Sequence, residues 1–143
     1  MIAKHCYTPL MRRSMKRSFG FALTGLAHAF RRERNIRLFL YVYIVVIAIG
    51  VYLRLLTWEW LTIILAGGLF LCTELLNTAI ERFVDVVDHN RKMDGGSGYH
   101  ANLKAAKDVA ASASLVALSV NILAIIIVFW PYAAMRVAIL LQK

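Results

Sequence analysis

Three runs of apolar residues without a formal charge dominate this sequence and constrain its fold more than any other feature. They occupy residues 38–53, 60–73 and 109–135. A helix needs about 20 predominantly apolar residues to cross the hydrocarbon core of a bilayer. The first run reaches that length by continuing past Arg54, and the second by continuing past Glu74 with a helical pattern. Each run is therefore long enough, with its extension, to span a membrane.

Composition supports a membrane protein and argues against other classes. Of the 143 residues, 60% are hydrophobic and 17% are charged, whereas soluble domains are about 45–50% apolar and about 25% charged. A chain this short has too little interior to hide so much apolar surface from water. We therefore predict an all-α integral membrane protein rather than a soluble enzyme, a disordered chain or a disulfide-stapled module. Its three transmembrane helices are expected at about residues 38–56, 60–88 and 104–130.

The distribution of positive charge predicts the orientation of these spans. The net charge is +9, and nine of the 17 Lys and Arg residues precede the first apolar run. Such clustering is typical of a cytoplasmic flank beside anionic lipid, and it does not suggest nucleic-acid binding. The N-terminus and the loop at 89–103 are then cytoplasmic, and the C-terminus is outside. Trp130, Pro131 and Tyr132 are expected to end the third span at the far interface.

The three spans belong to a single predicted membrane domain over residues 14–135. A disordered tail is expected at 1–13 and a short C-terminal tail at 136–143. Residues 14–37 form an amphipathic helix in this interpretation, because Phe19, Leu23, Leu26 and Phe30 recur on one face. Such a helix lies in the membrane interface with its basic residues in water. Cys6 and Cys72 lie on different sides of the lipid boundary, so no disulfide is expected.

A stripe of polar side chains descends the second predicted span toward the cytoplasm. At about 100° per residue its five members share an arc of about 80°. They are Glu74, Asn77, Glu81, Asp85 and Asp88. A solvated helix end explains the last two, but an ionisable group at membrane depth costs about 2.5–3.5 kcal/mol or more. Glu74, which has apolar residues on both sides, is therefore expected to face protein or a water-filled site.

The third span begins with residues suited to phosphate chemistry. Lys107 and Asp108 stand at its cytoplasmic edge, followed by small residues that allow close helix approach. Carboxylates beside Lys and Arg suit an Mg²⁺-nucleotide, because Mg²⁺ takes one or two carboxylates together with phosphate oxygens. The glycines at 95–98 lack the Lys-Ser/Thr of a P-loop, and the four His lack metal-ligand spacing. This set favours a kinase that acts on a lipid hydroxyl.

Three motifs resemble the prokaryotic diacylglycerol kinase family. They are RRERNIR at 31–37, ELLNTAIERFVD at 74–85 and KAAKDVAASA at 104–113. The resemblance covers about residues 14–130 and looks strongest to the Gram-positive branch, whose members phosphorylate undecaprenol; the other branch phosphorylates diacylglycerol. It implies ATP and Mg²⁺ as cofactors, a location in the bacterial cytoplasmic membrane, and a homotrimer with sites between chains.

The resemblance also implies a role for individual residues. Glu74 matches the general base, and Glu33 and Glu81 match the carboxylates that bind Mg²⁺ with the nucleotide. Asn77 and Ala111 match positions that contact the acceptor lipid. The remaining matches line the nucleotide site: Arg17, Phe21, Asp85, Tyr99, His100, Lys107 and Asp108. Phe21 replaces a Tyr of some relatives, and the loop before Tyr99 is about eight residues longer than usual.

Two alternatives to an undecaprenol kinase stay open at this point. The acceptor could be diacylglycerol, since both branches use the same phosphate chemistry. A different class is a small oligomeric channel or proton relay, in which Glu74, Glu81 and Asn121 line a cation path. That alternative gives no reason for the Lys107-Asp108 pair.

Overall fold

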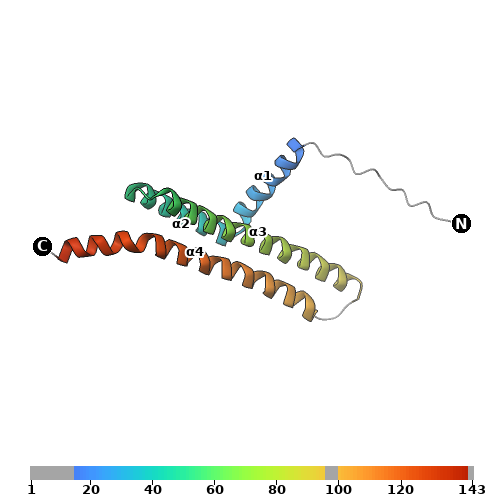
Figure 1. Cartoon of the computed structure of the whole chain (residues 1–143). Helices are drawn as coiled ribbons and strands as arrows, with labels where there is room; N and C mark the ends of the chain where they lie inside the picture. The colour runs from blue at the N-terminus through green and yellow to red at the C-terminus, as the bar shows by residue number, and fades with distance from the viewer. Residues whose placement is uncertain (1–14, 96–99, 142–143) are drawn as a thin grey trace.

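A computed structural model describes residues 15–95 and 100–141, with side chains described as far as residue 135, and over these ranges its regular secondary structure is all α-helix. The four helices are α1 (Met15–Arg32), α2 (Arg34–Leu53), α3 (Thr57–Met93) and α4 (Ala101–Leu141). Figure 1 shows α2, α3 and α4 running alongside one another while α1 projects from the bundle at an angle. The expectations for the tail at 1–13 and for Tyr99 lie outside the described residues.

Three helices are long and apolar enough to cross a membrane, as the sequence predicts. They are Arg34–Leu53, Thr57–Met93 and the Ala101–Met135 part of α4. At about 1.5 Å per residue, the 37 residues of α3 make a helix far longer than the roughly 30 Å hydrocarbon core. Helix α3 is therefore too long to lie wholly within the hydrocarbon core, and the later part of the polar stripe lies toward its Met93 end.

The junction between α1 and α2 differs from the predicted continuous helix at 14–37. Helix α1 ends at Arg32, Glu33 is extended (φ −94°, ψ 117°), and α2 begins at Arg34. Arg37 stabilises the break, because its Nη1 donates hydrogen bonds to the carbonyls of Phe30 (3.3 Å) and Arg31 (2.8 Å). A basic side chain on the last carbonyls of a helix is a common helix end. The motif at 31–37 therefore forms a corner between the two helices.

The C-terminal end of α4 also differs from the expected end of the third span. Pro131 lies inside α4, which continues to Leu141, so the helix does not end at Trp130, Pro131 and Tyr132, where the third span was expected to end. The tail expected at 136–143 stays a prediction. Proline removes one backbone hydrogen bond from a helix. Membrane-spanning helices tolerate that loss where neighbouring groups satisfy the freed carbonyl.

A buried carboxylate joins the turn between α2 and α3 to α4. Glu59 is 4% exposed, and its Oε2 accepts hydrogen bonds from the Leu56 backbone N–H and from the Tyr132 hydroxyl, both at 2.7 Å. An acidic group in the first turn of a helix also interacts favourably with the helix dipole. Glu59 therefore connects three elements at this end of the bundle.

Removing the Tyr132 hydroxyl should loosen this connection. We expect Tyr132→Phe to lower the free energy of unfolding by about 1–3 kcal/mol, because it leaves a buried carboxylate oxygen one donor short. Thermal unfolding in detergent would measure the loss. Tyr41→Phe, which alters an exposed ring on α2, is the control, and equal stability of the two variants would contradict the proposed connection.

The bundle is held together unevenly. Helices α3 and α4 provide most of the interhelical contacts, whereas α2 touches α3 at fewer places. One such place is a cluster in which the Phe39 and Phe70 rings lie 4.7 Å apart beside Ala117. At another, the Tyr43 ring lies against Gly67, where its hydroxyl donates to the Ile63 carbonyl. Helix α2 therefore leans on α3 at a few contacts and leaves space between itself and α4.

Candidate functional site

Two neighbouring cavities lie beside α2, and we call them the polar groove, lined by α2, α3 and α4, and the apolar groove, lined by α2 and α4. The polar groove has a volume of about 560 Å³ and the apolar groove about 510 Å³, and Ile125 lines both. Besides the Tyr43 phenol, the lining of the polar groove includes six polar residues among apolar ones: Asn35, Glu74, Asn77, Glu81, Ser114 and Asn121. Charged and apolar walls therefore meet along one seam of the molecule.

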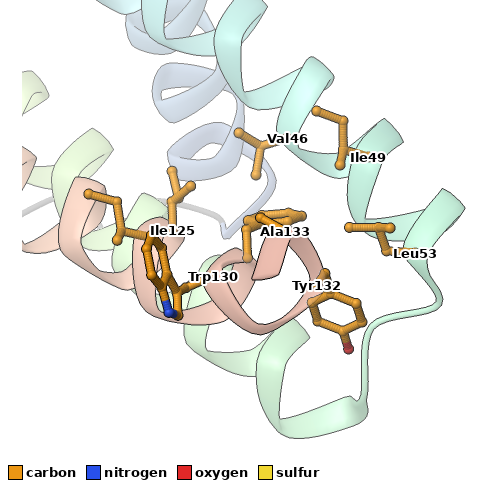
Figure 2. Close-up of a pocket in the computed structure, with 9 residues that line it drawn as sticks. Val46, Ile49, Leu53, Ile125, Trp130, Tyr132 and Ala133 are labelled. Carbon is orange, nitrogen blue, oxygen red and sulfur yellow. The ribbon is translucent and has the colours of Figure 1, made fainter. Parts of the chain in front are cut away.

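The apolar groove continues this seam toward the outer end predicted for the bundle. Figure 2 shows Val46, Ile49 and Leu53 of α2 on one side and residues of α4 on the other. Tyr132 turns its hydroxyl away from the groove, toward the start of α3, where it meets Glu59. From Asn35 to Leu53 the seam follows α2 over about 27 Å of helix, close to the thickness of the hydrocarbon core.

Glu74 faces the polar groove rather than solvent. The residue is 6% exposed, and its Oε1 accepts a hydrogen bond of 3.1 Å from the Asn35 Nδ2 of α2. The prediction that this glutamate is enclosed by protein is confirmed. A carboxylate in a largely apolar cavity is the arrangement by which enzymes hold a general base.

The next polar pair lies one turn further along α3. Asn77 Nδ2 donates to Glu81 Oε1 at 3.0 Å, while the buried Asn77 Oδ1 has no hydrogen-bond partner. Carboxylate and amide oxygens are ligands that Mg²⁺ accepts. The pair therefore fits a divalent cation that completes its coordination with phosphate oxygens and water.

Glu33, the other predicted Mg²⁺ ligand, has a different partner. Its Oε1 lies 2.9 Å from Arg82 Nη2 on α3, and both side chains are partly exposed. Within the described ranges no group of three or more His, Cys, Asp or Glu side chains forms a metal site. Glu33 would have to exchange Arg82 for a cation to act as a ligand.

The predicted nucleotide residues are only partly brought together. Lys107 Nζ of α4 lies 2.7 Å from Asp85 Oδ1 of α3, so the basic start of α4 does face the carboxylate stripe. Asp108 is exposed, and Ala111 lines the polar groove. His100 precedes α4, and its Nδ1 accepts a hydrogen bond from the Asn102 backbone N–H at 3.3 Å.

Helix α1 keeps two further predicted residues away from the grooves. Arg17 and Phe21 are exposed on α1 and line neither cavity. A role at the nucleotide therefore requires α1 to approach α3, or a second chain to supply it.

Sequence reasoning missed several residues that the fold brings to this site. Asn35 and Ser114 line the polar groove, and Arg82 pairs with Glu33. Asn121, which the channel alternative placed on a cation path, is 3% exposed, and its Oδ1 has no hydrogen-bond partner. The spacing of seven between Ser114 and Asn121 places both on one face of an otherwise apolar helix. This spacing could have identified them from the sequence as residues of the groove.

Comparison with known proteins gives consistent matches. A sequence model described as prokaryotic diacylglycerol kinase matches residues 20–129. The chain is 36% identical over 100 residues to a diacylglycerol kinase of Synechocystis sp., covering 70% of this chain and 53% of that protein, so it spans about half of that relative. It is 34% identical over 116 residues to an undecaprenol kinase of Bacillus subtilis, covering 80% of this chain and 87% of that protein.

Proposed function

Because the chain belongs to the prokaryotic diacylglycerol kinase family, we propose that it transfers the γ-phosphoryl group of ATP to the hydroxyl of a membrane lipid. The observation that carries this proposal is the buried Glu74, which lines the polar groove, next to the apolar groove along the same seam. That arrangement suits an amphiphile whose hydroxyl meets the carboxylate while its chain stays in a hydrocarbon environment.

In the proposed reaction Glu74 accepts the proton of the lipid hydroxyl while the hydroxyl oxygen forms a bond to the γ-phosphorus of ATP. The bond between that phosphorus and its bridging oxygen breaks, and ADP leaves. Such a transfer depends mainly on alignment and on neutralising phosphate charge. Lys107, together with Arg17 once α1 has approached, is proposed to supply that positive charge. Glu81 and Glu33 would hold Mg²⁺, which would supply further positive charge to offset that of the phosphates.

We infer that undecaprenol is the first acceptor to test and diacylglycerol the second. The apolar groove supports this order, because the seam runs for about the whole hydrocarbon thickness. A polyprenol, with one very long chain, could occupy that length, whereas an acyl chain of diacylglycerol reaches about half of it. One relative is named a diacylglycerol kinase and the other an undecaprenol kinase. Their similar identities to this chain therefore do not identify its acceptor.

We further propose that the enzyme works as a homotrimer in the bacterial cytoplasmic membrane. The N-terminus and the loop before α4 would face the cytoplasm, where ATP is available. Sites between chains would supply what the single chain lacks, because Arg17 and Phe21 lie away from the grooves. A channel is less well supported, since the residues that line the apolar groove carry no charge to stabilise an ion.

A phosphotransfer assay in mixed micelles tests the function. Labelled ATP would be offered with undecaprenol, with diacylglycerol or without lipid, each with and without Mg²⁺. Mg²⁺-dependent label in one lipid supports the kinase and identifies its acceptor. Absence of transfer to either lipid by folded protein, together with ion flux in liposomes without nucleotide, would favour the channel instead.

Replacing Glu81 tests the proposed Mg²⁺ site. We expect Glu81→Gln to lower kcat by at least about 100-fold at ordinary Mg²⁺, because a neutral amide is a poorer ligand for a hard cation. The fold should persist, since an amide oxygen can still accept the hydrogen bond from Asn77. Thermal unfolding and size-exclusion chromatography would check folding and assembly, and full activity at ordinary Mg²⁺ would remove Glu81 from the metal site.

A further inference from the structure

The first residues of the α2 segment make two separate polar contacts with α3. Glu33 meets Arg82 at 2.9 Å, and two residues later Asn35 meets Glu74 at 3.1 Å. Arg82 and Glu74 are two turns apart on α3. The start of α2 is therefore held beside the polar stripe at two heights, and the deeper contact is made with the proposed base.

The contact at Glu74 is selective for one of its two oxygens. Asn35 Nδ2 donates to Oε1, and within the described part of the chain no side chain or backbone group is recorded as donating to Oε2. A glutamate has three side-chain torsions, and the apolar residues of the groove offer it few polar partners. One directed hydrogen bond from a neighbouring helix therefore determines which way this carboxylate points.

Asn35 also lies in the groove itself. It lines the polar groove together with Glu74. Among the α2 residues of that lining, Asn35 and Tyr43 have polar side chains. Tyr43 is already engaged with the Ile63 carbonyl on α3. The carboxamide of Asn35 is therefore the group of α2 best placed to organise polar chemistry on the α2 side of the seam.

We propose that Asn35 is a positioning residue for the phosphoryl transfer: its amide holds Oε1 of Glu74 so that Oε2 faces the acceptor hydroxyl. This inference rests on the proposed function and adds a residue from α2 to it. Misplacing a reacting group by about 1 Å can cost about 100-fold in rate. Losing the amide should therefore affect the chemical step more than the binding of either substrate.

The test compares four proteins in the phosphotransfer assay: wild type, Asn35→Ala, Asn35→Asp and Asn35→Gln. We expect Asn35→Ala to lower kcat by about 10- to 100-fold with KM values for ATP and lipid within about threefold of wild type. Asn35→Asp, which is nearly isosteric but places a second carboxylate against Glu74, should lose at least as much. Asn35→Gln keeps an amide donor and should recover most of the lost kcat. Asn90→Ala, at an exposed position near the end of α3, is the control.

A double-mutant cycle separates positioning from general damage. In a Glu74→Asp background the shorter side chain no longer meets Asn35, so adding Asn35→Ala should cost less than about threefold. Multiplicative losses in that cycle, or wild-type kcat in Asn35→Ala, would overturn the inference. So would a loss that Asn35→Gln does not reduce. Absence of transfer by the wild-type protein itself would instead refute the proposed function.

Discussion

Replacing Glu74 with glutamine should reduce phosphoryl transfer by about 100- to 10,000-fold, the range that a positioned general base contributes. Glutamine has nearly the same shape and can still accept a hydrogen bond from Asn35 through its carbonyl oxygen. It cannot take a proton from the acceptor hydroxyl. The variant should therefore fold and bind ATP, while kcat falls with every acceptor that the wild type uses.

The phosphotransfer assay measures this loss, and thermal unfolding in detergent shows whether the fold is intact. Removing a buried charge from an apolar groove should leave stability unchanged or raise it, since a neutral side chain costs less to bury. Asp94→Asn, at the exposed end of α3, is the control for loss of one negative charge. A Glu74→Gln protein with more than about a tenth of wild-type kcat would exclude Glu74 as the base.

The second large effect concerns stability. Gly67→Ala should destabilise the bundle by about 1–3 kcal/mol or more, the usual cost of overpacking. A Cβ at this position would overlap the phenol ring of Tyr43. Tyr43 would have to leave its place against α3, and with it the hydrogen bond to the Ile63 carbonyl.

The adjacent residue provides a matched control. Gly68→Ala adds the same methyl group one position away, where no atom lies within 4 Å apart from the adjacent residues and the backbone of the same helix, so its stability should equal or exceed that of wild type. Unfolding by heat or by a denaturing detergent would compare the two variants. If both unfolded at the same temperature, the contact between Tyr43 and Gly67 would not hold α2 to α3.

Much of the fold could be predicted because hydrophobic length and helical spacing are local properties of the sequence. The apolar runs define the three long helices, and the spacing of Glu74, Asn77 and Glu81 places them on one face. Pro131 misled the prediction because a proline inside a helix is tolerated where tertiary structure or the membrane compensates. The helix break at Glu33 depends on Arg37 reaching back to the carbonyls of Phe30 and Arg31, and no periodicity reports such a contact.

The candidate site was predictable only in part for a related reason. The polar stripe of α3 is visible in one segment, but its partners come from other helices. Asn35 meets Glu74 across 39 positions of sequence, and Arg82 meets Glu33 across 49. Tyr132 meets Glu59 across 73 positions, and no local pattern around Glu59 indicates that partner. Pairings between residues so far apart in the sequence depend on how α2 packs against α3 and how α3 packs against α4.

Under the proposed function, the seam along α2 and α4 has a consequence for how a lipid acceptor would reach the protein. Because the groove lies between two membrane-spanning helices and follows their length, a lipid can diffuse into it sideways within the bilayer and keep its chain in hydrocarbon throughout. No free energy is then spent on extracting the chain into water, which would cost about 0.8 kcal/mol per CH₂. The concentration that governs the reaction is therefore the mole fraction of acceptor in the membrane plane. Diluting the acceptor with inert lipid should slow turnover, while diluting the whole suspension with buffer should not.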